Sequence, residues 1–273
     1  MYFISDLYIY PVKSLSGIRL EQAKLTDRGF QYDRRFVLID ENNRFLSQRE
    51  LPKMTLLQPV ISGDKLFIFE KRNAGDVFEL PLQPDSGKEC PVQMFKDVSR
   101  GVLVDEAADR WFSKKLGVAC RLVYMPDEVR RPVDADFAIN GDIAGFSDGY
   151  PLLMIGQASL NDLNSRLEWP VPMNRFRPNL VVSGAAPFEE DTMKAFTING
   201  VSFYAVKSCA RCVITTIDQE SGHQGREPLK TLSTYRNLEK RICFGQNVLF
   251  NGSGEIKVGD LLEVAQRQPH LFE

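Results

Sequence analysis

The first hundred residues consist of short β-rich runs separated by turn residues, and this pattern limits the chain to folds built from small sheets. Runs of about four to eight residues rich in β-branched and aromatic side chains, bounded by Gly, Ser, Asp or Pro, are typical of strands. Such runs occur here at 3–10, 35–39, 57–61, 65–69 and 77–80. We therefore expect a short-stranded sheet or half barrel in this part of the chain.

The remainder of the chain mixes helical and strand patterns. Apolar residues at helical spacing predict amphipathic helices over 105–116 and 158–167. The dipeptide Asn199-Gly200 lies between alternating runs and predicts a hairpin with a type I′ turn over 195–206. Other runs predict strands at 120–124, 152–155, 180–183, 248–250 and 261–264, and a short helix at 228–235. The expected fold class is mainly β with α, an α+β protein.

Composition sets outer limits on function. The chain has 273 residues, 43% of them hydrophobic, which is enough for one or two domains with a sizeable core. A formal net charge of −2 argues against a nucleic-acid partner, because phosphate binding needs a concentrated basic face. No run approaches the ~18 consecutive apolar residues of a membrane span, and the first residues lack the plan of a signal peptide. We expect a cytoplasmic protein without a membrane partner.

The strongest chemical signal is the cysteine pair Cys209 and Cys212. Lys207 and Arg211 lie beside it, and cationic neighbours favour thiolate over thiol, which makes sulfur a better nucleophile or metal ligand. The β-branched run at 213–217 follows directly and predicts a buried strand. We therefore expect the two sulfurs at the mouth of a strand.

Several roles for this pair compete. A disulfide is disfavoured because the other cysteines, Cys90, Cys120 and Cys243, are scattered and the total of five is odd. Structural zinc needs four ligands, but His223 and His270 are far apart and form no knuckle. A thioredoxin-type redox pair begins a helix, whereas a strand is expected here. One cysteine that binds a soft metal centre remains the sharpest hypothesis.

Other candidate residues could bind an anion. Lys13 and Ser14 follow a proline on a predicted turn, where an ammonium and a hydroxyl could meet a phosphate, although a solvated turn is the simpler interpretation from the sequence alone. Arg34 and Arg35 begin a predicted strand, where one guanidinium could clamp an anion, although arginines at a strand edge usually face water. Alternation is expected to point one of the two inward. Arg177 precedes Pro178 and is expected to be extended, either as an anion clamp or solvated.

Asp148 lies in the segment S-D-G-Y-P, which predicts a turn before a strand. A carboxylate on such a turn is most often a local cap that accepts hydrogen bonds from its own backbone. From the sequence alone, the capping role is the simpler interpretation.

The sequence resembles the MOSC family, the domains related to the C-terminal part of molybdenum cofactor sulfurase, and is most similar to the amidoxime-reducing branch. The segments that carry the resemblance span nearly the whole chain: Y-P-V-K-S at 10–14, Y-D-R-R-F-V-L at 32–38, F-S-D-G-Y-P-L-L at 146–153, A-S-L-N-D-L-N-S-R-L at 158–167, F-R-P-N-L-V-V-S-G at 176–184, C-A-R-C-V-I-T-T-I-D-Q-E-S-G at 209–222 and R-E-P-L-K-T-L-S-T-Y-R at 226–236. The resemblance implies a MOSC N-terminal β-barrel-like domain at 1–117, a MOSC β-barrel domain with peripheral helices at 118–267, and a tail at 268–273.

The resemblance also implies a set of site residues. Cys212 would give molybdenum its protein sulfur ligand, and Cys209 would not be a ligand. Asp148 would lie beside the metal and shape the approach of substrate. The pterin and phosphate of the molybdenum cofactor would be bound by Lys13, Ser14, Arg35, Arg177, Ala210, Arg211 and Cys212. Ala210 stands where relatives often have serine, so only its backbone could contribute.

The implied function is that of a molybdenum-dependent enzyme that reduces N-hydroxylated compounds, such as amidoximes, hydroxylamines and N-hydroxylated bases. Electrons would come from a separate ferredoxin, cytochrome or flavin reductase, because no cysteine cluster of the iron–sulfur type lies near the end of the chain. Two alternatives stay open. One is a cofactor or sulfur carrier without reductase activity, and the other is a zinc-stapled structural module.

Overall fold

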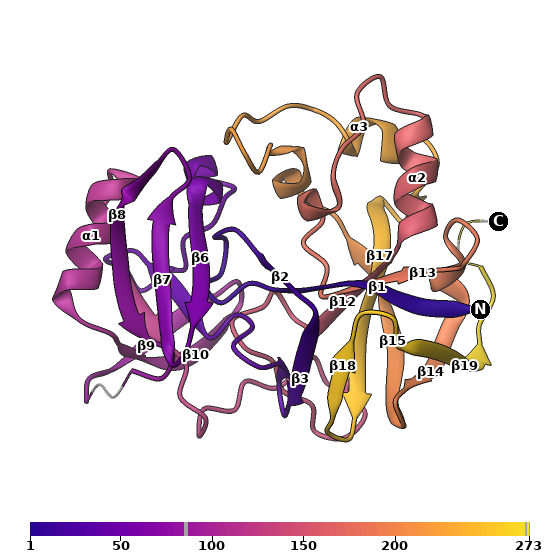
Figure 1. The fold of residues 1–273 in the computed structure, drawn as a ribbon, viewed down its shortest axis with the longest axis horizontal. Helices are drawn as coiled ribbons and strands as arrows, with labels where there is room; N and C mark the ends of the chain where they lie inside the picture. The colour runs from indigo at the N-terminus through magenta and orange to yellow at the C-terminus, as the bar shows by residue number, and fades with distance from the viewer. Residues whose placement is uncertain (85–86, 271, 273) are drawn as a thin grey trace.

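The computed structural model describes residues 1–84, 87–270 and 272. Two β-rich bodies lie side by side, one formed mainly by the N-terminal part of the chain and one by the C-terminal part (Figure 1). The chain enters the C-terminal body with its first strand, crosses to the N-terminal body, and returns through a long segment without regular strands between residues 125 and 151.

The C-terminal body is a closed barrel of seven strands. The strands are β1 (Tyr2–Ile9), β12 (Leu152–Gly156), β13 (Leu180–Ser183), β14 (Met193–Ile198), β15 (Val201–Ala210), β17 (Arg241–Asn251) and β19 (Leu261–Arg267). Their order is β12-β13-β1-β19-β14-β15-β17, and antiparallel pairing of β17 with β12 closes the barrel. Phe196 and Phe203 stack inside it, with ring centroids 5.4 Å apart. Burial of such alternating apolar side chains is the main stabilising contribution to a barrel of this kind.

Shorter strands extend and flank the barrel. β2 (Ile18–Leu20) pairs with β1, and β16 (Asn237–Leu238) pairs with β17. A separate three-stranded sheet contains β3 (Gln22–Thr26), β4 (Gly29–Phe30) and β18 (Glu255–Lys257). This small sheet therefore joins early and late segments of the chain.

The N-terminal body contains two small sheets. One consists of β6 (Leu57–Ser62), β7 (Lys65–Glu70) and β8 (Asn73–Pro81), and the other has the order β5 (Phe36–Ile39), β11 (Arg121–Tyr124), β10 (Asp97–Leu103) and β9 (Glu89–Met94). Helix α1 (Glu106–Leu116) buries Phe112 in the core of this body. The Asp105 side chain caps α1 by accepting from the Ala108 backbone N–H at 2.6 Å, and Gly117 ends it in the left-handed conformation.

The other helices lie against the barrel. They are α2 (Gln157–Ser165), α3 (Leu229–Leu232) and the 3-10 turns η2 (Met173–Arg175), η3 (Glu189–Thr192) and η4 (Val213–Thr216), whereas η1 (Pro52–Leu56) belongs to the N-terminal body. The mainly β, α+β fold class expected from the sequence is confirmed. The hairpin is confirmed too, because Asn199 and Gly200 join β14 to β15 with φ angles of 49° and 77°.

One local prediction is wrong. The β-branched run at 213–217 does not form a strand, because 213–216 is the 3-10 turn η4. The hydroxyls of Thr215 and Thr216 donate to the carbonyls of Cys212 and Val213, at 3.0 and 2.8 Å. Threonine hydroxyls can thus donate to nearby backbone carbonyls, which then need no partner strand. Scales of β propensity do not include this local bonding.

The division of the chain at residue 117 stays a prediction. The strand pairing does not follow this division. β1 lies in the barrel between β13 and β19, and β11 lies in the N-terminal body between β5 and β10. Strands from both sides of the predicted boundary therefore belong to the opposite body.

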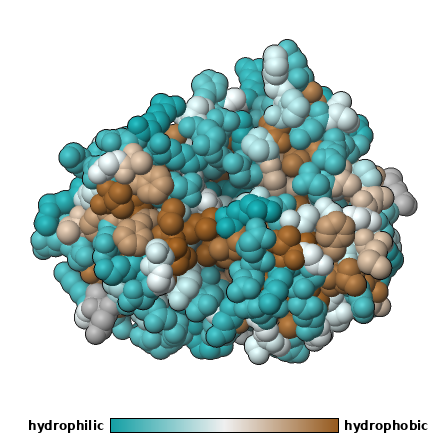
Figure 2. Space-filling view, viewed as in Figure 1, coloured by the Kyte–Doolittle hydropathy of each residue, from teal (hydrophilic) through white to brown (hydrophobic). Residues whose placement is uncertain are grey.

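The surface of the face drawn in Figure 2 is mostly hydrophilic, but a band of apolar surface runs across the junction between the two bodies. Among the residues that the structure describes, no helix is both long and apolar enough to cross a membrane.

Candidate functional site

A cleft lies where the turn after β1 and the segment before β5 meet one end of the barrel. Its empty volume, counted together with the open solvent at its mouth, is about 780 Å³. Cationic and sulfur-bearing side chains share its lining, namely Lys13, Arg34, Arg175, Arg177, Arg211, Cys209 and Cys212. Asp148 is the carboxylate among the lining residues. The cleft therefore has a strong excess of positive charge.

Lys13 lies at the base of this cleft with its side chain 7% exposed. The Lys13 backbone N–H donates to the carbonyl of Phe36 at 2.8 Å, which fixes the turn after β1 against β5. The ammonium donates to the Asp148 carboxylate and lies 5.1 Å from the centroid of the Phe45 ring. Burial lowers the pKa of Lys13 to about 8, although the negative charge of Asp148 opposes that shift.

Asp148 faces the open side of the cleft, with 60% of its side chain exposed. Desolvation alone would raise the pKa of Asp148, but the Lys13 ammonium and the Arg49 guanidinium outweigh it and hold the pKa well below its usual range. Gly145 lets this segment approach the N-terminal body closely, because a Cβ there would lie 2.8 Å from the Arg34 carbonyl oxygen. Asp148 is therefore an ionised partner of cations and not a local cap.

The neighbouring residues Arg34 and Arg35 direct their side chains to different places. Arg35 donates through Nε to the Met125 carbonyl at 3.0 Å and pairs with Asp127 at 2.7 Å, so its guanidinium lies outside the cleft lining. Arg34 lines the cleft instead, held by Asp33 at 2.6 Å. Alternation predicted that one of the two points inward, but both precede β5 and both side chains are largely buried, 12% exposed for Arg34 and 8% for Arg35. The structure does not bring Arg35, the residue assigned to cofactor binding, to the cleft. The cause is the left-handed backbone of Arg34, whose φ is 46°.

Arg177 and Arg34 sandwich one aromatic ring. Their guanidinium carbons lie 4.2 and 4.3 Å from the centroid of the buried Tyr10 ring. Arg177 also donates through Nη1 to the Leu15 carbonyl at 2.7 Å, and burial lowers its pKa to about 10. The expectation of an extended Arg177 is wrong, because its φ is 56°. These contacts hold it in a sparsely populated conformation, and such strain concentrates at functional sites.

The two cysteines of the pair have different surroundings. Cys209 lies at the end of β15, and its sulfur accepts from Arg211 Nη1 at 2.9 Å. Cys212 precedes η4 and faces Arg49. Although burial would lower the pKa of Arg49, the Cys212 sulfur and the Asp148 carboxylate outweigh it and raise that pKa. Arg49 thus places a positive charge between a thiol and a carboxylate.

Irregular pairing with β17 changes the direction of the side chains at the end of β15. The register between β15 and β17 shifts between Ala205 and Lys207 and again between Ser208 and Ala210. Bulges of this kind redirect side chains and are common next to functional sites. As a result, Cys209 lines the cleft while Lys207 lines a neighbouring groove. Exposed Ala210 and half-buried Arg211 also line the cleft, as does the buried Ser14.

Some lining groups have no hydrogen-bond partner within the described part of the chain. Buried polar atoms without a partner are Ser147 Oγ, Arg175 Nε, Arg211 Nε and Tyr150 OH. Such orphaned groups are rare in native structures and often mark a place where a ligand or water completes the bonding. The sequence did not single out Ser147, Arg175 or Arg49 for this site, and only their folded positions identify them.

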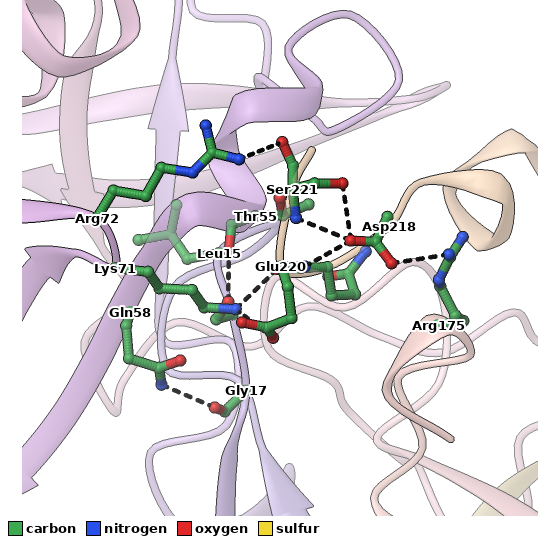
Figure 3. A network of polar contacts seen from close by, with 12 residues as sticks. Leu15, Gly17, Thr55, Gln58, Lys71, Arg72, Arg175, Asp218, Glu220 and Ser221 are labelled. Atoms are coloured by element: carbon green, nitrogen blue, oxygen red, sulfur yellow. Dashed lines mark hydrogen bonds and ion pairs between the residues drawn. The ribbon is translucent and has the colours of Figure 1, made fainter. Parts of the chain in front are cut away.

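A second junction between the two bodies is formed by residues 217–225, which we call the bridging loop (Figure 3). Lys71 donates to the Gln219 carbonyl and to Glu220 Oε1, both at 2.7 Å. Arg175 pairs with Asp218 at 2.9 Å from the barrel side. The bridging loop follows η4 directly, so it ties the Cys212 segment to the N-terminal body.

Comparison with known proteins agrees with the class that the fold and cleft define, a two-body β protein with a thiol-bearing, cation-rich site. The MOSC N-terminal beta barrel domain matches residues 1–119, and the MOSC domain matches residues 142–263. The chain belongs to the MOSC family.

Curated relatives include mitochondrial amidoxime-reducing component 1 of Mus musculus and of Homo sapiens. Each is 33% identical over 94% of this chain, which covers 80% of the mouse protein and 81% of the human protein. Molybdenum cofactor sulfurase of Oryza sativa is 32% identical over 97% of this chain, but the chain spans only 35% of that protein.

Proposed function

We propose that this protein binds the molybdenum cofactor and reduces N-hydroxylated compounds. The observation that carries the proposal is the joint presence, in one cleft, of the Cys212 thiol and an excess of buried and partly buried cationic groups. The names of the mouse and human relatives support the reaction class, since both are amidoxime-reducing components.

The residues of the cleft fit this cofactor chemically. A pterin cofactor with a phosphate is an anion with several hydrogen-bond acceptors, and the cleft offers guanidinium donors that lack partners, such as Arg211 Nε and Arg175 Nε. Thiolate is a preferred ligand of soft metals. Within the described residues, no group of three or more His, Cys, Asp or Glu side chains could form a metal cage. A metal ligated by Cys212 would thus take its other ligands from the cofactor.

We assign roles to the residues on this basis. Cys212 would ligate the metal, and Lys13, Arg34 and Arg177 would bind the anionic part of the cofactor. Cys209 would remain a hydrogen-bond acceptor for Arg211, which orients that guanidinium toward the cleft. When bound, the cofactor supplies two-electron chemistry that removes the N–O oxygen as water, using two protons and two electrons.

Asp148 would act on the substrate side of this site. Its carboxylate is exposed in the cleft and kept ionised by Lys13 and Arg49. An ionised carboxylate accepts hydrogen bonds, so it could orient the N–H and O–H groups of an amidoxime. The electrons would come from a separate protein of the ferredoxin, cytochrome or flavin reductase type.

One experiment tests the proposal against a carrier role, which the similarity to molybdenum cofactor sulfurase makes the second candidate. The protein is purified from a host that makes the cofactor and is analysed for molybdenum and for pterin fluorescence after oxidative release. It is then assayed for reduction of benzamidoxime by reduced methyl viologen. Near-stoichiometric molybdenum with turnover supports the enzyme. Cofactor without turnover supports the carrier, and a folded protein without molybdenum or pterin contradicts both.

A further inference from the structure

A second hollow adjoins the cleft. It is an open groove with an empty volume of about 1680 Å³, lined by the turn after β9, by β10 and by the segment 129–134. The groove and the cleft share Asp148, Gly149 and Tyr150. A molecule that reaches Asp148 in the cleft can therefore extend across these residues into the groove.

The groove has the features of a built site and not only of a surface dip. Ser99 and Arg131 line it, each is only 6% exposed, and Ser99 Oγ and Arg131 Nε have no hydrogen-bond partner among the described residues. Arg131 uses its Nη1 to donate to the carbonyls of Gly145 and Ser147, both at 2.9 Å. Nη2 lies 3.5 Å from the Asp148 carbonyl oxygen, and the Nε–H is left as a donor without an acceptor among the described residues.

Tyr150 adds a third donor at the boundary with the cleft. Its hydroxyl is buried without a partner in the described part of the chain, and burial raises the pKa of this phenol to about 12. The hydroxyl is therefore protonated near neutral pH. The lining of the groove thus contains three polar side chains from separate segments of the chain that each have a buried atom without a partner among the described residues.

The charges around the groove favour an anion as that acceptor. Five cationic residues line the groove, namely Lys96, Arg100, Arg130, Arg131 and Lys207. Arg100 lies 3.9 Å from Glu89 and Arg130 lies 3.6 Å from Asp27, so these two are partly neutralised. Among the carboxylates, Asp148 is paired with Lys13, Asp97 lies 4.0 Å from Arg131, and Asp134 accepts from the Asp136 backbone N–H at 3.2 Å. Within the described residues, neither Lys96 nor Lys207 has a carboxylate at ion-pair distance.

The groove also offers apolar contact. Phe95 and Val98 line it with 47% and 64% of their surfaces exposed. The Lys207 ammonium lies 4.1 Å from the centroid of the Phe137 ring. A ligand for this groove would combine an aromatic or apolar body with an anionic end.

We propose that the groove binds the anionic end of substrates whose N-hydroxyl group lies in the cleft, an inference that rests on the proposed function. The substrate class is then N-hydroxylated compounds in which an aromatic or heterocyclic body links the N–O group to a carboxylate or phosphate. Lys96 and Lys207 supply charge, and Arg131, Ser99 and Tyr150 supply hydrogen bonds. These residues determine specificity and take no part in the reduction.

Paired probes that differ only in charge test this proposal. Binding of 4-carboxybenzamidoxime and of its neutral 4-carboxamide is measured by isothermal titration calorimetry on the purified protein, and KM is measured for both in the reductase assay. We expect the carboxylate to bind about fivefold more tightly, since two exposed charge contacts contribute roughly 1 kcal/mol together. Raising the salt concentration should reduce the difference.

The matched variants separate the groove from general charge effects. Lys96→Gln with Lys207→Gln should reduce the preference to within about twofold. Lys24→Gln, on the exposed face of β3, makes the same change elsewhere and should leave it intact. N4-hydroxycytidine and its 5′-monophosphate form a second pair, which distinguishes phosphate from carboxylate as the preferred end.

The outcomes are distinct from those of the proposed function. Tighter binding of either anionic probe that is lost in the double variant supports the groove proposal. If the same probes bind but are not reduced, only the proposed reductase activity is contradicted. Equal binding and equal KM within both pairs overturns the groove proposal while turnover still supports the reductase.

Discussion

The cleft and the bridging loop both join the two bodies through ion pairs, but the lysine of the pair is buried more deeply in the cleft. In the loop, the Lys71 side chain is 17% exposed and the partner Glu220 is 70% exposed, so water screens the pair. In the cleft, Lys13 is 7% exposed and its partner Asp148 is 60% exposed, and burial lowers the pKa of Lys13 to about 8. The loop therefore resembles an ordinary surface contact, whereas the cleft holds charges against a desolvation penalty.

The two regions also differ in how many buried polar atoms lack a hydrogen-bond partner among the described residues. In Figure 3, Thr55 Oγ1 and Arg175 Nε are buried without a partner in the described part of the chain, but Arg175 also lines the cleft, where Arg211 Nε and Ser147 Oγ lack one as well. Leaving a buried donor unsatisfied costs about 1–3 kcal/mol. A protein retains such groups where a ligand completes them, and the presence of four of them in the cleft lining points to the cleft as the functional surface.

The largest expected effect concerns the cysteine pair. Cys212→Ser should abolish molybdenum retention, because serine replaces the soft thiolate ligand by a hard hydroxyl. Cys209→Ser is the matched control and should retain near-normal molybdenum, since the Cys209 sulfur is occupied by Arg211. Metal analysis of both purified variants checks this. Retained molybdenum in Cys212→Ser would remove the ligand assignment.

The next effect concerns the arginines. Arg177→Ala should weaken cofactor retention about tenfold or more, because a charge-assisted hydrogen bond contributes roughly 1.5–3 kcal/mol. Arg35→Gln should leave cofactor occupancy unchanged, because the Arg35 guanidinium is directed to Met125 and Asp127. Pterin released per folded protein is the measurement. The reverse ranking would show that Arg35 and not Arg177 binds the cofactor.

A smaller effect is expected from pH. Lys13 loses its proton as the pH rises through about 8, so its attraction for an anionic cofactor is present below that pH and lost above it. Cofactor release, followed by pterin fluorescence in the filtrate, should therefore increase between pH 7 and 9. Lys13→Arg stays charged over this range and should flatten the profile. An unchanged profile in that variant would assign the pH dependence to another group.

The smallest effect is expected at the bridging loop. Lys71→Met should lower the free energy of unfolding by about 1 kcal/mol or less, as for other exposed ion pairs, and should leave molybdenum content unchanged. Urea denaturation and metal analysis measure the two quantities. A loss of molybdenum in this variant would show that the bridging loop supports the metal site, which would contradict the difference proposed between the loop and the cleft.

Much of the fold follows from local patterns in the sequence. The runs around Leu57 and Lys65 form strands, and Asn199-Gly200 forms the expected hairpin turn, because each signal depends on neighbouring residues only. The β-branched run after Cys212 misled, since threonine hydroxyls satisfied the backbone locally. Short strands such as β9 and β10 were missed because polar and proline-containing runs carry a weak β signal.

The candidate site was predicted only in part. Motif positions pointed to Lys13, Asp148 and Cys212, which the fold brings into one cleft. Arg49 could not be found this way, because its proximity to Cys212 depends on tertiary packing between the two bodies. The exchange of Arg34 for Arg35 depends on a left-handed φ that no propensity scale assigns to arginine.

The position of β1 has a consequence for how the chain can be divided. The barrel needs residues 2–9 between β13 and β19, although the rest of its strands lie beyond residue 151. A fragment that begins at residue 118 would lack that strand and would present two unpaired strand edges, which are templates for aggregation. The N-terminal body is therefore an insertion within the barrel, and the two units are inseparable by a single cut.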